Sequence, residues 1–288
     1  MRPSTHFLLT RRAARISDAP ASLLPVALKA AEITSDLVRT RVPGLLTAKG
    51  DRDMATEVDY AVECAVRDYL KERTPNIAIL GEEEGITGDT TSDLLWAVDP
   101  VDGTANFVRG IPLCGFSLGL IERGRPVVGV IDLPFLSTRY HAAQHTGAYV
   151  GDRRIQASMT TDLKDAIVAI GDYAVGDGSE AKNPIRIALT ERLAANVQRV
   201  RMLGSAPIDL AWVAEGKLDA SITLSNKPWD TAAGIIIARE AGTKVTDQDG
   251  TDHTSNSVAT IATTAPLAEP IEKLICSAKR RGDLNQST

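Results

Sequence analysis

Two aspartates three residues apart, Asp99 and Asp102, lie in the segment WAVDPVDGTANF at residues 96–107. The short apolar run at residues 94–98 predicts a strand that ends at the first carboxylate. Pro100 stiffens the turn between the two aspartates, so both side chains can point at one place. Because two anions held close together repel each other, such a pair requires a bound cation or a shared proton.

The two residues that follow, Gly103 and Thr104, could bind an anion beside these carboxylates. Glycine lets the backbone approach a ligand closely, and consecutive amides in a turn often bind anionic groups. The alternative interpretation is an Asx turn that merely ends a strand, which is the usual role of a short Asp-Pro-x-Asp sequence. The longer motif, which extends to Phe107, favours the chemical interpretation.

Further acids lie where strands are predicted to end or helices to begin. Glu82 belongs to a glutamate run at residues 81–85, which alone is typical of a solvated loop. Asp230 opens an apolar helix, where an acid complements the helix dipole. Asp59 and Thr56 lie at the start of another predicted helix and would by default be helix caps. Each acid therefore has a structural explanation when it is considered alone.

Taken together, these carboxylates form an all-oxygen set of potential metal ligands, with no cysteine or histidine beside them. Oxygen ligands favour Mg²⁺ or Mn²⁺ and not zinc. A carboxylate-bound Mg²⁺ next to a pair of backbone amides indicates phosphate chemistry. Such a reaction needs no serine or cysteine nucleophile, so we expect Cys114 to be a core residue.

The motifs that carry these residues resemble those of the inositol monophosphatase family, the Mg²⁺-dependent and lithium-sensitive phosphatases. They occur in the family's order and extend over residues 23–277, nearly the whole chain. The resemblance implies an α/β (α+β) fold, a layered αβαβα sandwich of the inositol monophosphatase and fructose-1,6-bisphosphatase type, and a homodimer. The matching segments are DPVDGTANF at 99–107, WDTAAG at 229–234, GEE at 81–83, GSA at 204–206 and the pattern of Lys49, Asp53, Thr56 and Asp59.

The resemblance also implies two or three bound Mg²⁺ ions, for which Mn²⁺ could substitute. Glu82, Asp99 and the backbone carbonyl of Val101 would hold one ion. Asp99, Asp102 and Asp230 would hold a second ion. The implied reaction is the attack of an activated water on the phosphorus atom of a small phosphate monoester.

The resemblance assigns the remaining roles to residues of the same motifs. Glu82, Thr104 and Asp59 are the candidate catalytic residues. Thr104, with Asp59 nearby, would orient the attacking water, and Glu82 with Asp59 would help to place a third, weaker ion. The backbone amides of Gly103 and Thr104 would hold the phosphate. The implied substrate-binding residues are Asp102, Gly103, Thr104, Gly204, Ser205, Ala206, Thr223 and Asp230.

The expected substrate is a small phosphorylated metabolite, with an inositol or sugar phosphate considered first. In the inositol phosphatases a glutamate seven residues before the aspartate of the Trp-Asp motif bonds the polyol hydroxyls, whereas this chain has Thr223 there. Lys227 nearby could meet a second phosphate or a carboxylate, or be a solvated loop charge. The segment at residues 171–178 is expected at the substrate rim. Histidinol phosphate, fructose 1,6-bisphosphate and 3′-phosphoadenosine 5′-phosphate therefore remain alternatives.

A non-catalytic function is a separate alternative, because some bacterial relatives of this family act through RNA polymerase and ribosomal RNA transcription. The net charge of −5 provides no bulk basic field for nucleic acid, so no nucleic-acid partner is expected. A pure scaffold would have no reason to concentrate mutually repelling carboxylates. The acids therefore favour the enzyme over the RNA polymerase-associated regulator.

The chain of 288 residues, 43% of them hydrophobic, is typical of one large globular domain or two fused lobes. We expect a tail at residues 1–22, an N-terminal α+β lobe at residues 23–160 that carries most metal ligands, and a C-terminal α/β lobe at residues 161–288. The first lobe places helices before a meander of strands, and the second alternates strands with helices. Helices are predicted at residues 23–39, 59–70, 184–196, 206–214, 229–241 and 267–277.

Three widely spaced cysteines fit neither a disulfide framework nor a zinc motif. We therefore expect reduced thiols and a cytoplasmic location. No apolar run approaches the roughly 18–20 residues that a membrane-spanning helix needs, so no membrane partner is expected.

Overall fold

The computed structural model describes residues 20–41, 44, 46–50 and 53–285, so the expected tail lies almost wholly outside the described residues. The helices are α1 (Leu24–Thr40), α2 (Glu57–Arg73), α3 (Thr104–Val108), α4 (Ser179–Asn196), α5 (Ala206–Ala214), α6 (Pro228–Glu240) and α7 (Ala268–Asn285). Short 3₁₀ helices are η1 (Pro20–Leu23), η2 (Pro134–Leu136), η3 (Leu163–Asp165) and η4 (Ala265–Leu267). None of the described helices is both long enough and apolar enough to cross a bilayer.

The strands form a hairpin and two larger sheets. The hairpin consists of β1 (Leu46–Gly50) and β2 (Asp53–Thr56). The large sheet contains β3 (Ala78–Gly81), β4 (Gly85–Thr87), β5 (Leu94–Asp102), β6 (Gly115–Glu122), β7 (Arg125–Leu133), β8 (Thr138–Ala143), β9 (Gly147–Val150) and β10 (Arg153–Ile155). The small sheet contains β11 (Ile167–Ile170), β12 (Arg199–Arg201), β13 (Ala220–Thr223), β14 (Lys244–Thr246) and β15 (Thr260–Thr263).

The two sheets differ in topology. The order in the large sheet is β10-β9-β8-β7-β6-β5-β3-β4, and its neighbours are antiparallel except for the parallel pair β3 and β5. The order in the small sheet is β12-β11-β13-β15-β14. Here β11 is parallel to both β12 and β13, while β15 is antiparallel to β13 and β14. The meander predicted for the first half of the chain is thus confirmed, as is the alternation in the second half.

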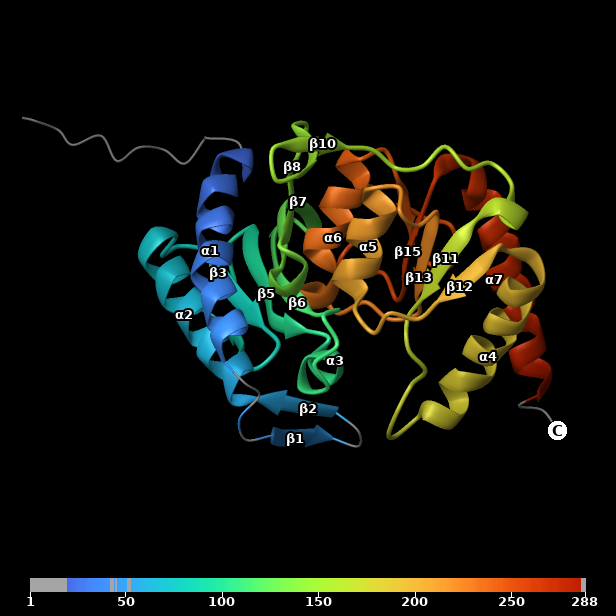
Figure 1. Ribbon diagram of the computed structural model, residues 1–288, viewed down its shortest axis with the longest axis horizontal. Helices are drawn as coiled ribbons and strands as arrows, with labels where there is room; N and C mark the ends of the chain where they lie inside the picture. The colour runs from blue at the N-terminus through green and yellow to red at the C-terminus, as the bar shows by residue number, and fades with distance from the viewer. Residues whose placement is uncertain (1–19, 42–43, 45, 51–52, 286–288) are drawn as a thin grey trace, which may run out of the picture.

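The helices and sheets form five layers (Figure 1). Helices α1 and α2 cover the outer face of the large sheet, α5 and α6 lie between the sheets, and α4 and α7 cover the outer face of the small sheet. This is the layered αβαβα sandwich that the resemblance implies, so the expected fold class is confirmed. Because α5 and α6 contact both sheets, the division into two lobes near residue 160 stays a prediction.

Helix α2 shows how the sequence pattern produces this layering. Val58, Val62, Val66 and Leu70 recur at helical spacing, and all four are buried in the core that α1 and α2 share with the large sheet. Burying an apolar stripe of this kind stabilises each residue by roughly 1.5–3 kcal/mol relative to exposure. The stripe therefore fixes which face of α2 points at the sheet.

Two glycines let α6 lie close to the large sheet. A Cβ on Gly119 of β6 would lie 2.7 Å from the Cβ of Ala232, and one on Gly129 of β7 would lie 2.5 Å from the carbonyl oxygen of Ala233. Both distances are shorter than van der Waals contact, so neither position has room for a side chain. Since Asp230 lies in the first turn of α6, this packing fixes its position relative to the large sheet.

Three predicted boundaries are wrong. Helix α7 continues to Asn285 and does not end at residue 277. Strand β5 continues to Asp102, beyond its predicted end, because pairing with β6 resumes there after an irregularity. Helix α4 begins at Ser179, after Gly178 in a left-handed conformation, so Pro184 lies inside the helix and not in its first turn. The hairpin of β1 and β2, strand β4 and helix α3 are absent from the prediction, since each is too short to show a clear period.

Candidate active site

Three carboxylates from distant parts of the chain come together at one cavity. Oxygen atoms of Glu82, Asp99 and Asp230 all lie within 4.8 Å of one another. Glu82 follows β3, Asp99 lies in β5, and Asp230 lies in the first turn of α6. The cavity has a volume of about 260 Å³. Its other lining residues are Asp102, Gly103, Thr104, Ala105, Asp172, Gly204 and Lys227.

The turn between Asp99 and Asp102 presents both carboxylates to this cavity. Asp99 is only 1% exposed, and its Oδ1 accepts a hydrogen bond from the amide of Val101 at 3.1 Å. This bond is the Asx turn of the simpler interpretation, so that turn is compatible with a site for chemistry. Asp102 accepts a hydrogen bond from the Oγ of Ser205, which caps the start of α5.

Gly103 and Thr104 bring the backbone to the edge of the same cavity. Gly103 has a φ of 80°, and a Cβ there would lie 2.8 Å from the carbonyl oxygen of Leu113. Both the conformation and the close approach therefore require glycine. The Oγ1 of Thr104 lies 3.0 Å from the carbonyl oxygen of Val101 and 3.3 Å from Oδ1 of Asp59. It donates to one of these acceptors at a time.

Asp59 is both a helix cap and a neighbour of Thr104. Its Oδ2 accepts a hydrogen bond from the amide of Thr56 at 2.9 Å, while the Oγ1 of Thr56 caps the start of α2. The capping role expected for both residues is thus confirmed. Because Asp59 is fully buried, its second oxygen is held at a fixed place beside Thr104. The Lys49 and Asp53 side chains lie outside the described part of the chain.

Some of the predicted substrate-binding residues line the cavity and others do not. Asp102, Gly103, Thr104, Gly204 and Asp230 line it. Ser205, Ala206 and Thr223 do not line it.

Thr223 is the last residue of β13 and points toward the neighbouring loop. A Cβ on Gly171 would lie 3.4 Å from the Cγ2 of Thr223, which shows how closely the two segments pack. In its place Asp172 and Lys227 face the cavity.

Cys114 and the other cysteines take no part in this site. The expected core position of Cys114 is confirmed, because its side chain is fully buried. Burial raises the pKa of the thiol to about 12, and the charges of Asp102 and Asp59 add to the effect. A thiol with this pKa is a poor nucleophile near neutral pH. Cys64, Cys114 and Cys276 are all free, as expected.

The carboxylates of the cavity perturb one another strongly. Burial raises the pKa of Asp99 well above its usual range, and repulsion from Glu82, Asp102 and Asp230 raises it further. Burial also raises the pKa of Asp102, with Asp230 as the next contributor, although the hydrogen bond from Ser205 acts in the opposite direction. These shifts mean that full ionisation of the cluster is costly unless a cation lies among the oxygens.

A buried ion pair that sequence reasoning missed supports the turn of Glu82. Glu63 and Arg67 lie one helical turn apart in α2, with 2.7 Å between carboxylate and guanidinium, and are almost completely buried. The carboxylate of Glu63 accepts hydrogen bonds from the amides of Glu83 and Glu84 at 2.9 and 3.0 Å. Arg67 donates to the carbonyl of Gly85 and to Thr87.

We call this arrangement of Glu63 and Arg67 the α2 clamp. It holds the backbone on the C-terminal side of Glu82, so it determines where that carboxylate lies. The detectable signal in the sequence is a Glu and an Arg four residues apart on the otherwise apolar face of a helix. Their hydrogen-bond partners at residues 83–87 lie beyond the end of α2, however, and no local sequence pattern identifies them.

Asp209 is a second buried acid that sequence reasoning missed. Burial raises the pKa of its carboxyl well above the usual range, and nearby Asp172 raises it further. Its Oδ1 has no hydrogen-bond partner within the described part of the chain. Burial therefore favours the neutral form of Asp209, and the charged form raises the pKa of Asp102.

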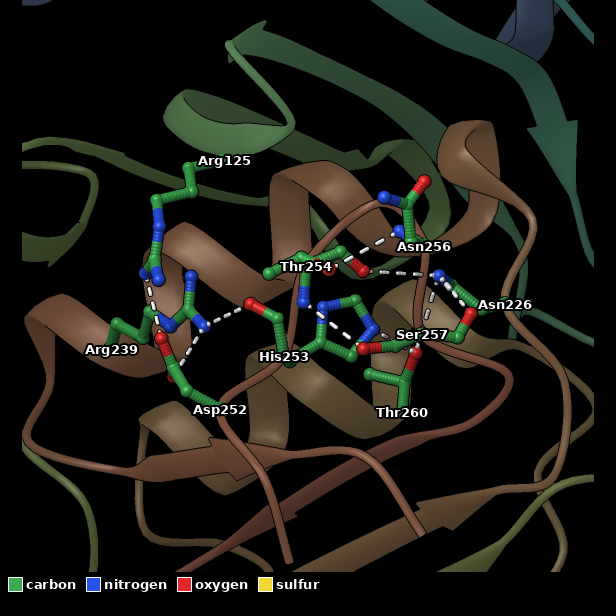
Figure 2. A network of polar contacts seen from close by, with 9 residues as sticks. All are labelled: Arg125, Asn226, Arg239, Asp252, His253, Thr254, Asn256, Ser257 and Thr260. Atoms are coloured by element: carbon green, nitrogen blue, oxygen red, sulfur yellow. Dashed lines mark hydrogen bonds and ion pairs between the residues drawn. The ribbon is translucent and has the colours of Figure 1, made fainter. Parts of the chain in front are cut away.

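A network of side chains fixes the loop that leads into α6 (Figure 2). Asn226 donates to the carbonyl of Ser257 at 2.8 Å. Its Oδ1 accepts a hydrogen bond from Thr231 of α6 at 2.9 Å. Nearby, buried His253 bonds to Thr260 at 3.1 Å. Burial lowers the pKa of His253 to about 4, so this imidazole is neutral at physiological pH. The start of α6, and hence Asp230, is thus held from the side of the small sheet.

The sequence and the fold of this chain are similar to those of known proteins. A model of the inositol monophosphatase family matches residues 20–282. The chain belongs to this family. The fructose-1,6-bisphosphatase/inositol-1-monophosphatase of Thermotoga maritima is 32% identical over 235 residues, which cover 82% of this chain and 87% of that protein. The Nus factor SuhB of Pasteurella multocida is 33% identical over 204 residues, 71% of this chain and 75% of its own.

Solved structures of the inositol monophosphatase family agree with the fold. The Thermotoga maritima IMPase has a TM-score of 0.81 at 29% identity and covers 91% of this chain and 99% of its own. The inositol monophosphatase from Anabaena (Nostoc) sp. PCC 7120 has a TM-score of 0.80 at 30% identity, with 89% and 96% covered. The chain is therefore a phosphoric monoester hydrolase of a metal-dependent phosphatase family, with a carboxylate cluster in its cavity.

The α2 clamp leads to a first prediction. In the Glu63→Gln variant the amide cannot accept all the bonds of the carboxylate, and Arg67 loses its buried counter-charge. The turn of Glu82 then loosens, and Mg²⁺ affinity measured by isothermal titration calorimetry falls by about tenfold or more. The control is Glu72→Gln, an exposed position of the same helix. Unchanged Mg²⁺ affinity in a folded Glu63→Gln protein would contradict this role.

The repulsion within the cluster leads to a second prediction. The folded protein retains a proton on Asp99 at pH values where the unfolded chain, with an Asp pKa of about 3.9, has lost it. In EDTA, stability therefore falls as pH rises from about 4 toward the raised pKa. Asp99→Asn weakens this dependence, to which Asp102 and Asp209 also contribute, and melts at a higher temperature than the parent in EDTA. Thermal melts against pH test this, with exposed Asp68→Asn as control; a parallel pH dependence in Asp99→Asn would refute it.

Proposed function

We propose that the protein hydrolyses a small phosphate monoester in a Mg²⁺-dependent reaction, with an inositol or sugar phosphate as the first candidate. The observation that carries this proposal is the convergence of Glu82, Asp99 and Asp230 oxygens within 4.8 Å of one another. The donor set consists of oxygen atoms alone, which suits Mg²⁺ or Mn²⁺. The raised pKa of Asp99 is a second argument, because a divalent cation would offset the repulsion from Glu82, Asp102 and Asp230 that contributes to it.

We infer two metal positions that share the carboxylate of Asp99. Glu82, Asp99 and the carbonyl of Val101 would hold one ion, and Asp99, Asp102 and Asp230 a second. A third, weaker ion would involve Glu82 and Asp59. When bound, Mg²⁺ supplies acidification of water and neutralisation of phosphate charge.

Thr104 and Asp59 are suited to orient the attacking water. When the Oγ1 of Thr104 donates its proton to Asp59 or to the carbonyl of Val101, its lone pairs are left to accept a hydrogen bond from water. The fixed place of Asp59 in the cap of α2 keeps that direction constant. The amides of Gly103 and Thr104 would donate to phosphate oxygens at the cavity edge.

Several properties are proposed because of the family resemblance. We expect inhibition by lithium, a homodimer and a cytoplasmic location. Fructose 1,6-bisphosphate stays an alternative substrate, supported by relatives named fructose-1,6-bisphosphatase/inositol-1-monophosphatase. Histidinol phosphate and 3′-phosphoadenosine 5′-phosphate also stay open, because Thr223 offers no carboxylate for polyol hydroxyls.

Phosphate release from a substrate panel tests the proposal. The panel contains inositol 1-phosphate, histidinol phosphate, fructose 1,6-bisphosphate, 3′-phosphoadenosine 5′-phosphate and several sugar phosphates, each with Mg²⁺, with EDTA and with added Li⁺. We expect Mg²⁺-dependent turnover that falls about 100-fold or more in Asp230→Asn, since metal stabilisation of charge supplies several kcal/mol. Asp68→Asn should match the parent. Folded, Mg²⁺-bound protein that releases no phosphate from any panel member would count against the proposal.

A second candidate function is regulation in association with RNA polymerase. It is supported by relatives named Nus factor SuhB, at 33% and 35% identity. The two functions predict opposite results for an inactive Asp102→Asn variant in cells that lack the gene. Rescue of the deletion phenotype by this variant would favour the regulator, whereas failure at normal protein levels would favour the enzyme.

A further inference from the structure

Two charged side chains in the cavity, Asp172 and Lys227, have no role in the carboxylate cluster. Lys227 is the one basic residue among the described lining residues, and Asp172 comes from the loop after β11. Neither side chain forms an ion pair in the described part of the chain. Both charges are therefore available to a ligand that enters the cavity.

The two loops that carry these residues lie side by side. Strands β11 and β13 are neighbouring parallel strands, with Ile170 opposite Ile222, and the loops follow their carboxyl ends. Crevices outside the carboxyl ends of parallel strands are common ligand sites in α/β sheets. Asp172 and Lys227 therefore occupy a place where the topology favours recognition of the non-reacting part of a substrate.

Arg186 of α4 ties the two loops together. Its guanidinium donates to the carbonyl of Asp172 at 3.0 Å and to the carbonyl of Leu224 at 3.1 Å. A planar guanidinium with two acceptors holds a fixed separation between them better than a flexible ammonium could. Asn183, also in α4, adds two hydrogen bonds to the backbone of Ala174 in the first loop.

The second loop is also held from its other side (Figure 2). Asn226, next to Lys227, bonds to the carbonyl of Ser257. It also bonds to Thr231 in the first turns of α6. The ammonium of Lys227 lies 5.8 Å from the ring centroid of Trp229, which restrains it without neutralising its charge. Hydrogen bonds thus hold the loop, and the contact of its cation in the described part of the chain is with a ring and not with a carboxylate.

From this arrangement we propose that Asp172 and Lys227 select the substrate, a hydroxylated phosphate monoester that carries a second anionic group. Lys227 binds the second anion, which is a phosphate or a carboxylate, and Asp172 accepts a hydrogen bond from a hydroxyl of the same molecule. The inference rests on the proposed phosphatase function and narrows its substrate class. The carboxylates with a bound metal, and the amides of Gly103 and Thr104, would hold the reacting phosphate, so Lys227 would serve a different acidic group.

Matched pairs of substrates test this selection. Fructose 1,6-bisphosphate is compared with fructose 1-phosphate, and 2-phosphoglycerate with glycerol 2-phosphate, as the ratio of the two kcat/KM values. The more anionic member carries an additional phosphate in the first pair and a carboxylate in the second pair. We expect the parent to prefer the more anionic member of at least one pair, which also identifies the kind of anion. Added salt should weaken that preference by screening the contact.

Lys227→Met should lower this preference by about tenfold or more, mainly through KM, because the contact is made in the ground state and transition state alike. Asp172→Asn should lower kcat/KM for both members of a pair by similar factors, since each has hydroxyls, and should leave the ratio unchanged. Lys71→Met, at an exposed position of α2, is the matched control. Thermal melts confirm that each variant is folded.

The outcomes separate the inference from the proposed function. A parent that shows no preference in either pair, or a preference unchanged in Lys227→Met, overturns the inference while Mg²⁺-dependent phosphate release still upholds the phosphatase. An absence of Mg²⁺-dependent release from every member overturns both. A preference that is lost in Lys227→Met and kept in Lys71→Met supports the assignment of Lys227.

Discussion

Mutual repulsion among clustered carboxylates is the constraint on which the rest of this structure depends. Glu82, Asp99 and Asp230 come from three distant segments, yet their oxygens lie within 4.8 Å of one another. Burial and proximity both favour the protonated form of Asp99, so the cluster costs free energy until a cation lies among its oxygens. The protein must therefore hold these acids in place by contacts made elsewhere.

Those contacts are hydrogen bonds and close packing that belong to the five-layered frame. The α2 clamp holds the turn after Glu82, Ser205 bonds to Asp102, and Asn226 ties the loop before Asp230 to the small sheet. A buried ion pair such as Glu63 with Arg67 is weak evidence for net stability, but it strongly disfavours conformations that leave either charge unpaired. The frame thus holds the acids in a single arrangement at some cost in stability.

The motif acids could be predicted because the sequence marks the end of each element that carries them. Apolar runs and turn residues locate β5 and the start of α6, so Asp99 and Asp230 are found without knowledge of the fold. The α2 clamp cannot be predicted in this way, since the partners of Glu63 are backbone amides that only the tertiary structure places beside it. Helix α3 escapes it as well, because five residues are too few to form a stable helix by local propensity.

Different factors determine the types and positions of the residues on the two sides of the cavity. On the metal side, every residue must satisfy the geometry of a cation, so type and spacing are constrained together and a motif results. On the other side, Asp172 and Lys227 lie on loops whose shape depends on Arg186 and Asn226, and no ion dictates their spacing. Thr223 illustrates the consequence, because its place in the sequence is that of a substrate ligand while its side chain packs outside the lining. Chemistry can therefore be deduced from the motifs, whereas substrate choice depends on how the loops are held.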